Sequence, residues 1–122
     1  MATYKTSIPS AISAVKWTDT AASATEVEVS TSGITIHQVR IVNTANTTKL
    51  YLKLYNSNAS GLTIGTSAPE VVLPVEASSS VEYAFDPGIV YSAALCYGVL
   101  TTGGTAGTTG PTTAITVELL TS

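Results

Sequence analysis

Residues 48–56 have the sequence TKLYLKLYN, in which aliphatic side chains alternate with aromatic or basic ones. Successive side chains of a β-strand point to opposite faces, so this alternation predicts a strand with one face in a core. The core face would carry Leu50, Leu52 and Leu54, and the solvent face Tyr51, Lys53 and Tyr55. This segment is the strongest indication that the chain folds as a β protein.

The same period of two recurs along the rest of the chain. It is present in residues 24–31, 34–43, 80–85 and 113–122. Within 34–43 the alternation changes phase, which predicts a β-bulge or a change of sheet near His37.

Four other segments predict how the strands are arranged. Residues 69–77 (PEVVLPVEA) contain two prolines, which lack the N–H that a central strand needs, so we expect an edge strand. The nearly continuous apolar run 91–100 predicts a central strand that is covered on both faces. The tripeptide DPG at 86–88 is typical of a turn. Residues 101–113 predict a long Gly-rich loop, mobile unless a neighbouring subunit holds it.

These elements amount to seven or eight strands with turns between them, which is typical of an all-β sandwich. We predict one antiparallel β-sandwich domain over residues 25–122, jelly-roll or Greek-key-like. Residues 1–24 form either an N-terminal arm or a first strand, and 8–17 fit a short helix or a strand. Tyr4 and Trp17 are candidate anchors for a partner, while Trp17 could equally cover one end of the core.

Composition excludes several classes of partner. The 122 residues carry a net charge of −3, and the five Lys and Arg residues are dispersed, which argues against nucleic-acid binding. No apolar run approaches the ~20 residues of a membrane-spanning helix. No secretory signal is visible, so we expect either synthesis in the cytoplasm or a mature form whose leader was replaced by Met1. The single cysteine, Cys96, cannot form an internal disulfide and fits a small buried hydrophobe.

The sequence contains no recognisable catalytic or metal site. His37 is the only histidine, and a Ser–His–Asp arrangement would have to use it as the base. One Cys and one His cannot supply the four ligands of a zinc site. Glu26 and Glu28 share a strand face and fit a solubilising role better than an acid–base pair. We therefore expect no enzyme activity, no cofactor and no metal.

Three stretches resemble small β-sandwich virion proteins of tailed bacteriophages: 39–60 (VRIVNTANTTKLYLKLYNSNAS), 65–100 (GTSAPEVVLPVEASSSVEYAFDPGIVYSAALCYGVL) and 113–120 (TAITVELL). The resemblance implies a non-enzymatic virion component, most simply a capsid decoration (cement) protein on the outer shell. It implies the major capsid protein or another virion protein as partner, and a homo-oligomer, with a trimer favoured. The protein would be made in the host cytoplasm and located on the capsid surface.

The alternative is a head-fibre or tail-associated module that binds a host receptor or a glycan. Sugar sites are commonly built on exposed aromatic rings, and Tyr51 and Tyr55, on either side of Lys53, form the candidate patch. The candidate interface residues are Tyr4 and Trp17 for the anchoring arm of a decoration protein, and Tyr51, Lys53 and Tyr55 for the glycan or receptor patch.

Overall fold

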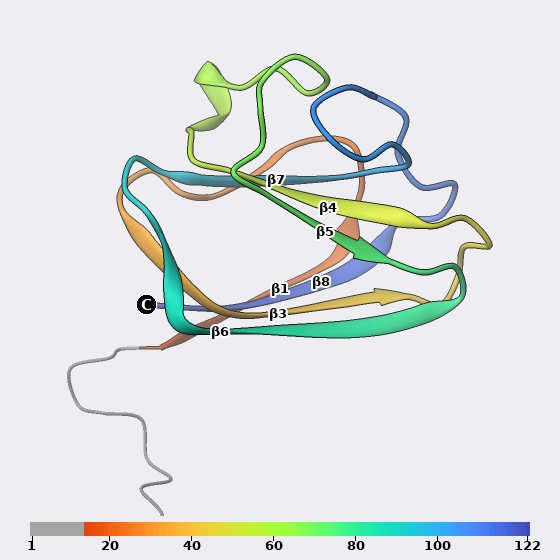
Figure 1. Ribbon diagram of the computed structural model, residues 1–122, viewed down its shortest axis with the longest axis horizontal. Helices are drawn as coiled ribbons and strands as arrows, with labels where there is room; N and C mark the ends of the chain where they lie inside the picture. The colour runs from red at the N-terminus through yellow and green to blue at the C-terminus, as the bar shows by residue number, and fades with distance from the viewer. Residues whose placement is uncertain (1–13) are drawn as a thin grey trace, which may run out of the picture.

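A computed structural model describes residues 14–122 of the chain, and this part is all-β (Figure 1). Its strands are β1 (Val15–Ala22), β2 (Val27–Ser30), β3 (Ile34–Asn43), β4 (Leu50–Tyr55), β5 (Val71–Val75), β6 (Ser79–Tyr91), β7 (Leu95–Leu100) and β8 (Ile115–Thr121). A single 3₁₀ turn, η1 (Ala59–Gly61), lies between β4 and β5. Within residues 14–122, no helix has the length and apolar character needed to cross a membrane.

The strands form an eight-stranded jelly roll. The first strand pairs with the eighth, the second with the seventh, the third with the sixth and the fourth with the fifth, all antiparallel. Pairing of β3 with β8 and of β4 with β7 joins these pairs into two sheets. The first sheet has the order β1-β8-β3-β6 and the second β2-β7-β4-β5. The predicted antiparallel sandwich is therefore confirmed, and the pairing pattern is that of a double-sheet jelly roll.

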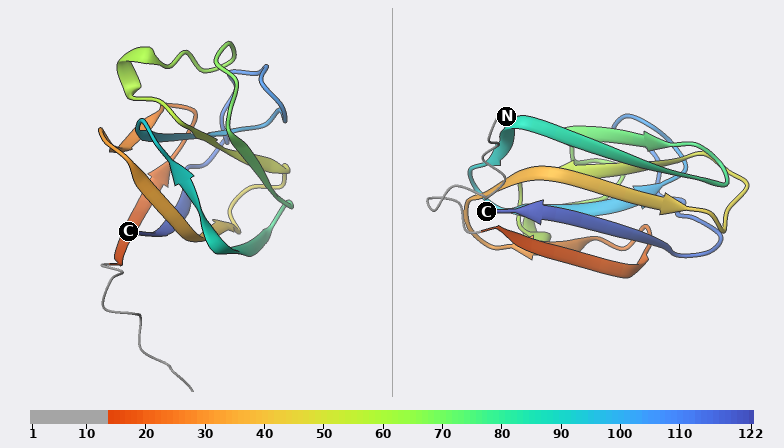
Figure 2. Two further views of the ribbon diagram at one scale, coloured as in Figure 1. Left: turned by 60° about the vertical axis from the view of Figure 1, so that its left-hand side comes forward. Right: turned by 90° about the horizontal axis from the view of Figure 1, so that it is seen from below.

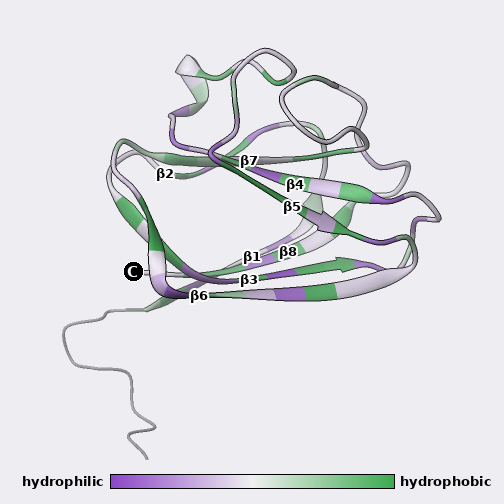
Figure 3. Cartoon of the chain, viewed as in Figure 1, coloured by the Kyte–Doolittle hydropathy of each residue, from purple (hydrophilic) through white to green (hydrophobic). Residues whose placement is uncertain are grey.

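The two sheets face each other across one apolar core, as two views of the ribbon show (Figure 2). Leu50, Leu52 and Leu54 of β4 are fully buried in this core, as their alternation predicts. Colouring by hydropathy shows apolar and polar segments interleaved along the strands (Figure 3). Period-two patterning thus directs one face of each sheet inward.

A bulge between β3 and β6 confirms the break in alternation predicted near His37. Ile36 pairs with Ile89 and Gln38 with Ala84, so His37 alone lies opposite residues 85–88. The DPG tripeptide at 86–88 was predicted to be a turn, and this is wrong: strand β6 continues through it and bends there. Gly88 permits the bend, because a Cβ there would lie 2.8 Å from the Ile36 carbonyl oxygen.

Two strand positions and the burial of the cysteine are also as predicted. Strand β5 is at the edge of the second sheet, and β7 is an internal strand of that sheet. The strand predicted over 91–100 is shorter than expected, because Tyr91 ends β6 and only Leu95–Leu100 form β7. All six residues of β7 are buried, including Cys96. Burial raises the pKa of the Cys96 thiol to about 11, which keeps it protonated and unreactive at neutral pH.

Residues 15–22 adopt the first of the eight strands, which was one of the two alternatives for 1–24. Strand β1 pairs with β8 from Val15↔Thr121 to Ala22↔Ile115, so the sandwich includes residues before 25. Tyr4 lies outside the described residues.

A buried pair of asparagines ties three loops together at one end of the sandwich. Asn43, at the end of β3, donates to the carbonyl oxygens of Thr48 and Glu76. Asn46 donates to Asn43 Oδ1 and to the Thr113 carbonyl oxygen, and accepts from the Thr113 amide. Because buried amides need partners, this network fixes the loops before β4, β6 and β8.

Candidate functional site

The outer face of β4 was predicted to be the solvent face, and this is wrong for two of its three residues. Lys53 is 0 % exposed and Tyr55 is 1 % exposed, while Tyr51 is half-buried. Two loops, 56–70 and 101–114, lie over this face of the second sheet (Figure 1). The expected patch of Tyr51, Lys53 and Tyr55 is thus largely covered by the chain itself.

Lys53 holds the Gly-rich loop in place. Its Nζ donates a hydrogen bond of 2.9 Å to the carbonyl oxygen of Ala106, near the middle of the loop. Burial lowers the pKa of Lys53, because the charged form loses hydration. At the base of the loop, Thr101 donates from its amide and its hydroxyl to the Thr109 carbonyl oxygen. The loop is therefore bound by contacts within this chain.

Tyr55 lies in a small apolar cluster on the outside of the second sheet, packed with Cys96 and with Leu62 from the 56–70 loop. Its hydroxyl is buried without a hydrogen-bond partner among the described residues, and burial raises its pKa. Gly98 of β7 leaves room for the loop, since a Cβ there would lie 3.3 Å from Cδ1 of Ile64. Tyr55 acts here as a packing residue and has no open ring face to offer a sugar.

Tyr51 is the one member of the patch that stays in contact with solvent. A Cβ on Gly103 would lie 3.2 Å from Cε1 of its ring, and Lys49 Nζ lies 5.5 Å from its ring centroid. Lys49 in turn pairs with Glu76 at 3.2 Å. One ring between a loop backbone and an ion pair is a poor platform for stacking a sugar.

Trp17 connects the two sheets. From β1 its indole Nε1 donates a 3.0 Å hydrogen bond to the hydroxyl of Tyr97 on β7, and this hydroxyl donates to the Asp19 carboxylate. Burial, followed by the hydrogen bond to Asp19, raises the pKa of Tyr97. Trp17 also packs against the core. Of the two alternatives given for Trp17, the structure therefore shows the one in which its side chain covers part of the core.

A groove of about 410 Å³ opens beside Trp17, where β1 and β2 are the free edges of their sheets. Val15, Trp17, Val29 and Ile34 form its apolar wall. Val15 is 59 % exposed, so this part of the wall is open to solvent. The groove therefore presents apolar side chains near the start of the described residues.

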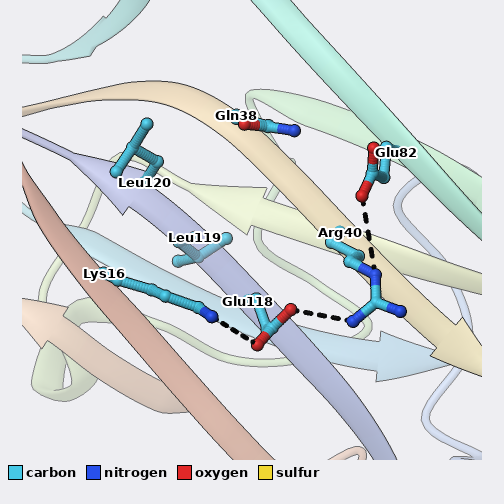
Figure 4. Close-up of a pocket in the computed structure, with 7 residues that line it drawn as sticks. All are labelled: Lys16, Gln38, Arg40, Glu82, Glu118, Leu119 and Leu120. Carbon is cyan, nitrogen blue, oxygen red and sulfur yellow. Dashed lines mark hydrogen bonds and ion pairs between the residues drawn. The ribbon is translucent and has the colours of Figure 1, made fainter. Parts of the chain in front are cut away.

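Four charged side chains cross the outer face of the first sheet, beside a shallow depression (Figure 4). Glu118 of β8 receives hydrogen-bonded ion pairs from Lys16 of β1 at 3.1 Å and from Arg40 of β3 at 3.0 Å. Arg40 also pairs with Glu82 of β6 at 3.5 Å. The hydrogen bonds from Arg40 and Lys16 lower the pKa of Glu118. We refer to Lys16, Glu118, Arg40 and Glu82 as the charge row.

His37, the one candidate base, contacts a serine. Its Nε2 lies 2.7 Å from the hydroxyl of Ser122 in an exposed position. No carboxylate among the described residues hydrogen-bonds to the ring, so the third group that orients a catalytic histidine is not present there. Within residues 14–122, no group of three or more His, Cys, Asp or Glu side chains is placed to hold a metal ion.

Two features of these surfaces were missed in the sequence. The sequence contained one indication that loop 56–70 covers β4: the apolar residues Leu62 and Ile64 occur within an otherwise polar segment. For the charge row, alternation could predict only that each of the four residues points outward from its strand. The strand order that brings them together is not encoded locally, so their proximity could not be predicted.

Comparison of the chain with models of protein families, with curated proteins and with solved structures found no match.

Proposed function

We propose that this protein is a non-enzymatic structural component of a bacteriophage virion, and that it decorates and stabilises the outer shell. The observation that carries the proposal is a jelly roll whose two long loops are fixed to its own body. Jelly rolls recur in viral capsid proteins, although they also occur in lectins and cupins. Such a rigid block suits packing beside neighbours, and residues 39–120 carry the resemblance to virion proteins.

Cement action consists of adding buried contact area across the joints between capsid subunits. The groove between β1 and β2 is the surface that fits this role best, because Val15 and Trp17 offer an apolar side wall. We assign to it an apolar segment of the major capsid protein as the occupant. Apolar area removed from water would supply the binding free energy.

The alternative, a fibre or tail module that binds a glycan, rested on an exposed tyrosine face. Two of the three residues of that face are buried, so it has less support than shell decoration. A glycan array probed with the whole protein tests this alternative directly, since binding would show as saturable signal on defined sugars.

Co-sedimentation with shells that lack the protein tests the decoration proposal. We expect saturable binding and a higher rupture temperature of the decorated shells. A truncated variant used in the same co-sedimentation experiment should lack only residues 1–13, because a longer deletion would remove β1 and disrupt the sandwich. Absence of binding at saturating protein would contradict the proposal.

Two matched variants locate the attachment surface. Val15→Asp places a charge in the groove, whereas Val90→Asp places one on β6, separated from β1 by two strands. Val15 and Val90 are both highly exposed, at 59 % and 65 %, so neither change should unfold the protein. We expect Val15→Asp to weaken shell binding at least tenfold and Val90→Asp to leave it unchanged; equal effects would exclude the groove.

A further inference from the structure

The charge row has an alternating order of signs across the whole first sheet. From β1 to β6 the order is Lys16, Glu118, Arg40, Glu82, or positive, negative, positive, negative (Figure 4). Arg40 lies directly opposite Glu118 on one side and Glu82 on the other in the strand register. Lys16 reaches Glu118 from one row away, since its backbone partner is Leu120.

This row lies on a face that none of the described loops crosses, in contrast to the outer face of the second sheet (Figure 2). The side chains of Lys16, Arg40 and Glu82 are 64 %, 46 % and 59 % exposed. On β8, β3 and β6 the rows on either side hold uncharged residues, namely Leu120, Gln38 and Ala84 on one side and Thr116, Val42 and Ser80 on the other. On β1 the backbone of Lys16 lies in the row of Leu120, and its side chain extends to Glu118. The face therefore presents two positive and two negative charges on a neutral background.

We propose that this face binds the same face of a second copy of the chain, across a two-fold axis parallel to the strands and midway between β8 and β3. Such an axis places β1 over β6 of the second copy and β8 over β3 of the second copy. Glu118 then meets Arg40 of the second copy. The backbone of Lys16 lies over Ala84 of the second copy, and its ammonium group, which extends to the row of Glu118, meets Glu82 of that copy. All four charges of each copy face an opposite charge, which is the self-complementarity that a two-fold interface requires.

The order of the charges selects this axis over the other two-fold axis in the plane of the face. An axis across the strands would place each charge over its own equivalent, so that Lys16 met Lys16 and Glu118 met Glu118. Like charges in contact disfavour that arrangement. The flanking rows accept the chosen axis, because it sets Leu120 over Gln38 and Thr116 over Val42 without adding a charge.

The expected association is weak and sensitive to salt. Four strands spaced about 4.8 Å apart and three rows of side chains give a contact of roughly 400 Å² per copy. Stable interfaces bury about 800 Å² per partner, so this contact has about half that area and belongs with weak, transient associations. Its charges are exposed and would be screened at high ionic strength. This pairing goes beyond shell decoration and does not depend on it, because the isolated protein suffices to test it. It is a two-fold dimer, and it therefore differs from the trimer that the resemblance to virion proteins favours.

Sedimentation equilibrium of the whole protein over a range of concentrations tests the pairing. We expect a dimer mass at low salt that shifts to monomer in about 0.5 M salt. Lys16→Glu with Arg40→Glu makes the row entirely negative, and Glu82→Lys with Glu118→Lys makes it entirely positive. Each double variant should be monomeric alone, and an equimolar mixture should recover the dimer mass. Circular dichroism of each variant verifies that it is folded before mixing.

A matched control separates the row from total charge. Arg40→Glu and Lys49→Glu change the net charge equally, but Lys49 pairs with Glu76, outside the row. We expect Arg40→Glu to weaken dimerisation at least tenfold and Lys49→Glu to leave it unchanged. The proposal is overturned by a monomer mass at all concentrations in low salt, by a trimer mass, or by folded double variants that stay monomeric when mixed.

Discussion

Lys53 departs most from the usual behaviour of its residue type. Lysine is almost never fully buried unless it is paired, and Lys53 has no exposed surface. Its charge is compensated by the backbone carbonyl of Ala106, which belongs to the loop that covers it. The lysine and the loop therefore stabilise each other.

Replacement of Lys53 tests this relation. Lys53→Ala should lower the free energy of unfolding by about 2–4 kcal/mol, since it leaves a cavity and an unpaired carbonyl. Lys53→Met keeps the volume and should cost less, about 1.5 kcal/mol or below. Both variants should speed amide hydrogen exchange in residues 101–113, as measured by mass spectrometry. Unchanged exchange in both would show that Lys53 does not hold the loop.

The Tyr97 hydroxyl gives a second test at the scale of single atoms. Tyr97→Phe leaves the Trp17 indole N–H and the Asp19 carboxylate without their shared partner, and should cost about 1–3 kcal/mol. Since Trp17 is the only tryptophan, its fluorescence should shift to the red in the folded variant.

Tyr55→Phe is the matched control, because the Tyr55 hydroxyl is buried without a partner among the described residues. Its removal should change the free energy of unfolding by less than about 0.5 kcal/mol or increase it. If chemical denaturation showed the same loss of unfolding free energy for Tyr97→Phe and Tyr55→Phe, the hydrogen bonds of Tyr97 between the sheets would contribute nothing to stability.

At the scale of the elements, the charge row links all four strands of the first sheet, with Glu118 of β8 at its centre. The pKa of Glu118 in the folded state lies below the value of 4.5 for an unperturbed glutamate. Ionised Glu118 therefore stabilises the fold above about pH 4.5, and this contribution is lost as the pH falls through the folded-state pKa.

Glu118→Gln should consequently lower the free energy of unfolding more at pH 7 than at pH 3. Urea denaturation at both pH values measures the difference between the wild type and the variant. In an Arg40→Met background the effect of Glu118→Gln should depend less on pH, because Arg40 is the main cause of the lowered pKa. If Glu118→Gln lowered the free energy of unfolding by the same amount at pH 7 and pH 3, this role of Glu118 would be contradicted.

The strands could largely be predicted from the sequence, whereas what covers them could not. Alternation along 50–54 identified the core face of β4, and the phase change at His37 identified the bulge. Alternation reports only which side of a strand a residue occupies. It does not say that loops 56–70 and 101–114 return over the outer side, so Lys53 and Tyr55 were assigned to solvent. The DPG at 86–88 failed similarly, because pairing with β3 keeps it within β6.

As a whole molecule, the protein is a jelly roll with unequal outer surfaces. One sheet is covered by its own loops, and the other presents a charge row and, at its β1 edge, an apolar groove. Among the described residues, no group of three or more His, Cys, Asp or Glu side chains on either surface is placed to hold a metal ion. In the proposed decoration role, the groove would contact the shell; in the proposed dimer, the charge row would contact a second copy of the chain.

The most direct test of shell decoration is cryo-electron microscopy of shells that lack the protein, imaged after addition of the full chain at saturating concentration. The account predicts density at symmetry-related positions of the outer surface, into which the jelly roll fits with the β1–β2 groove toward the shell. Bare shells under these conditions, with the added protein shown to be folded, would contradict it.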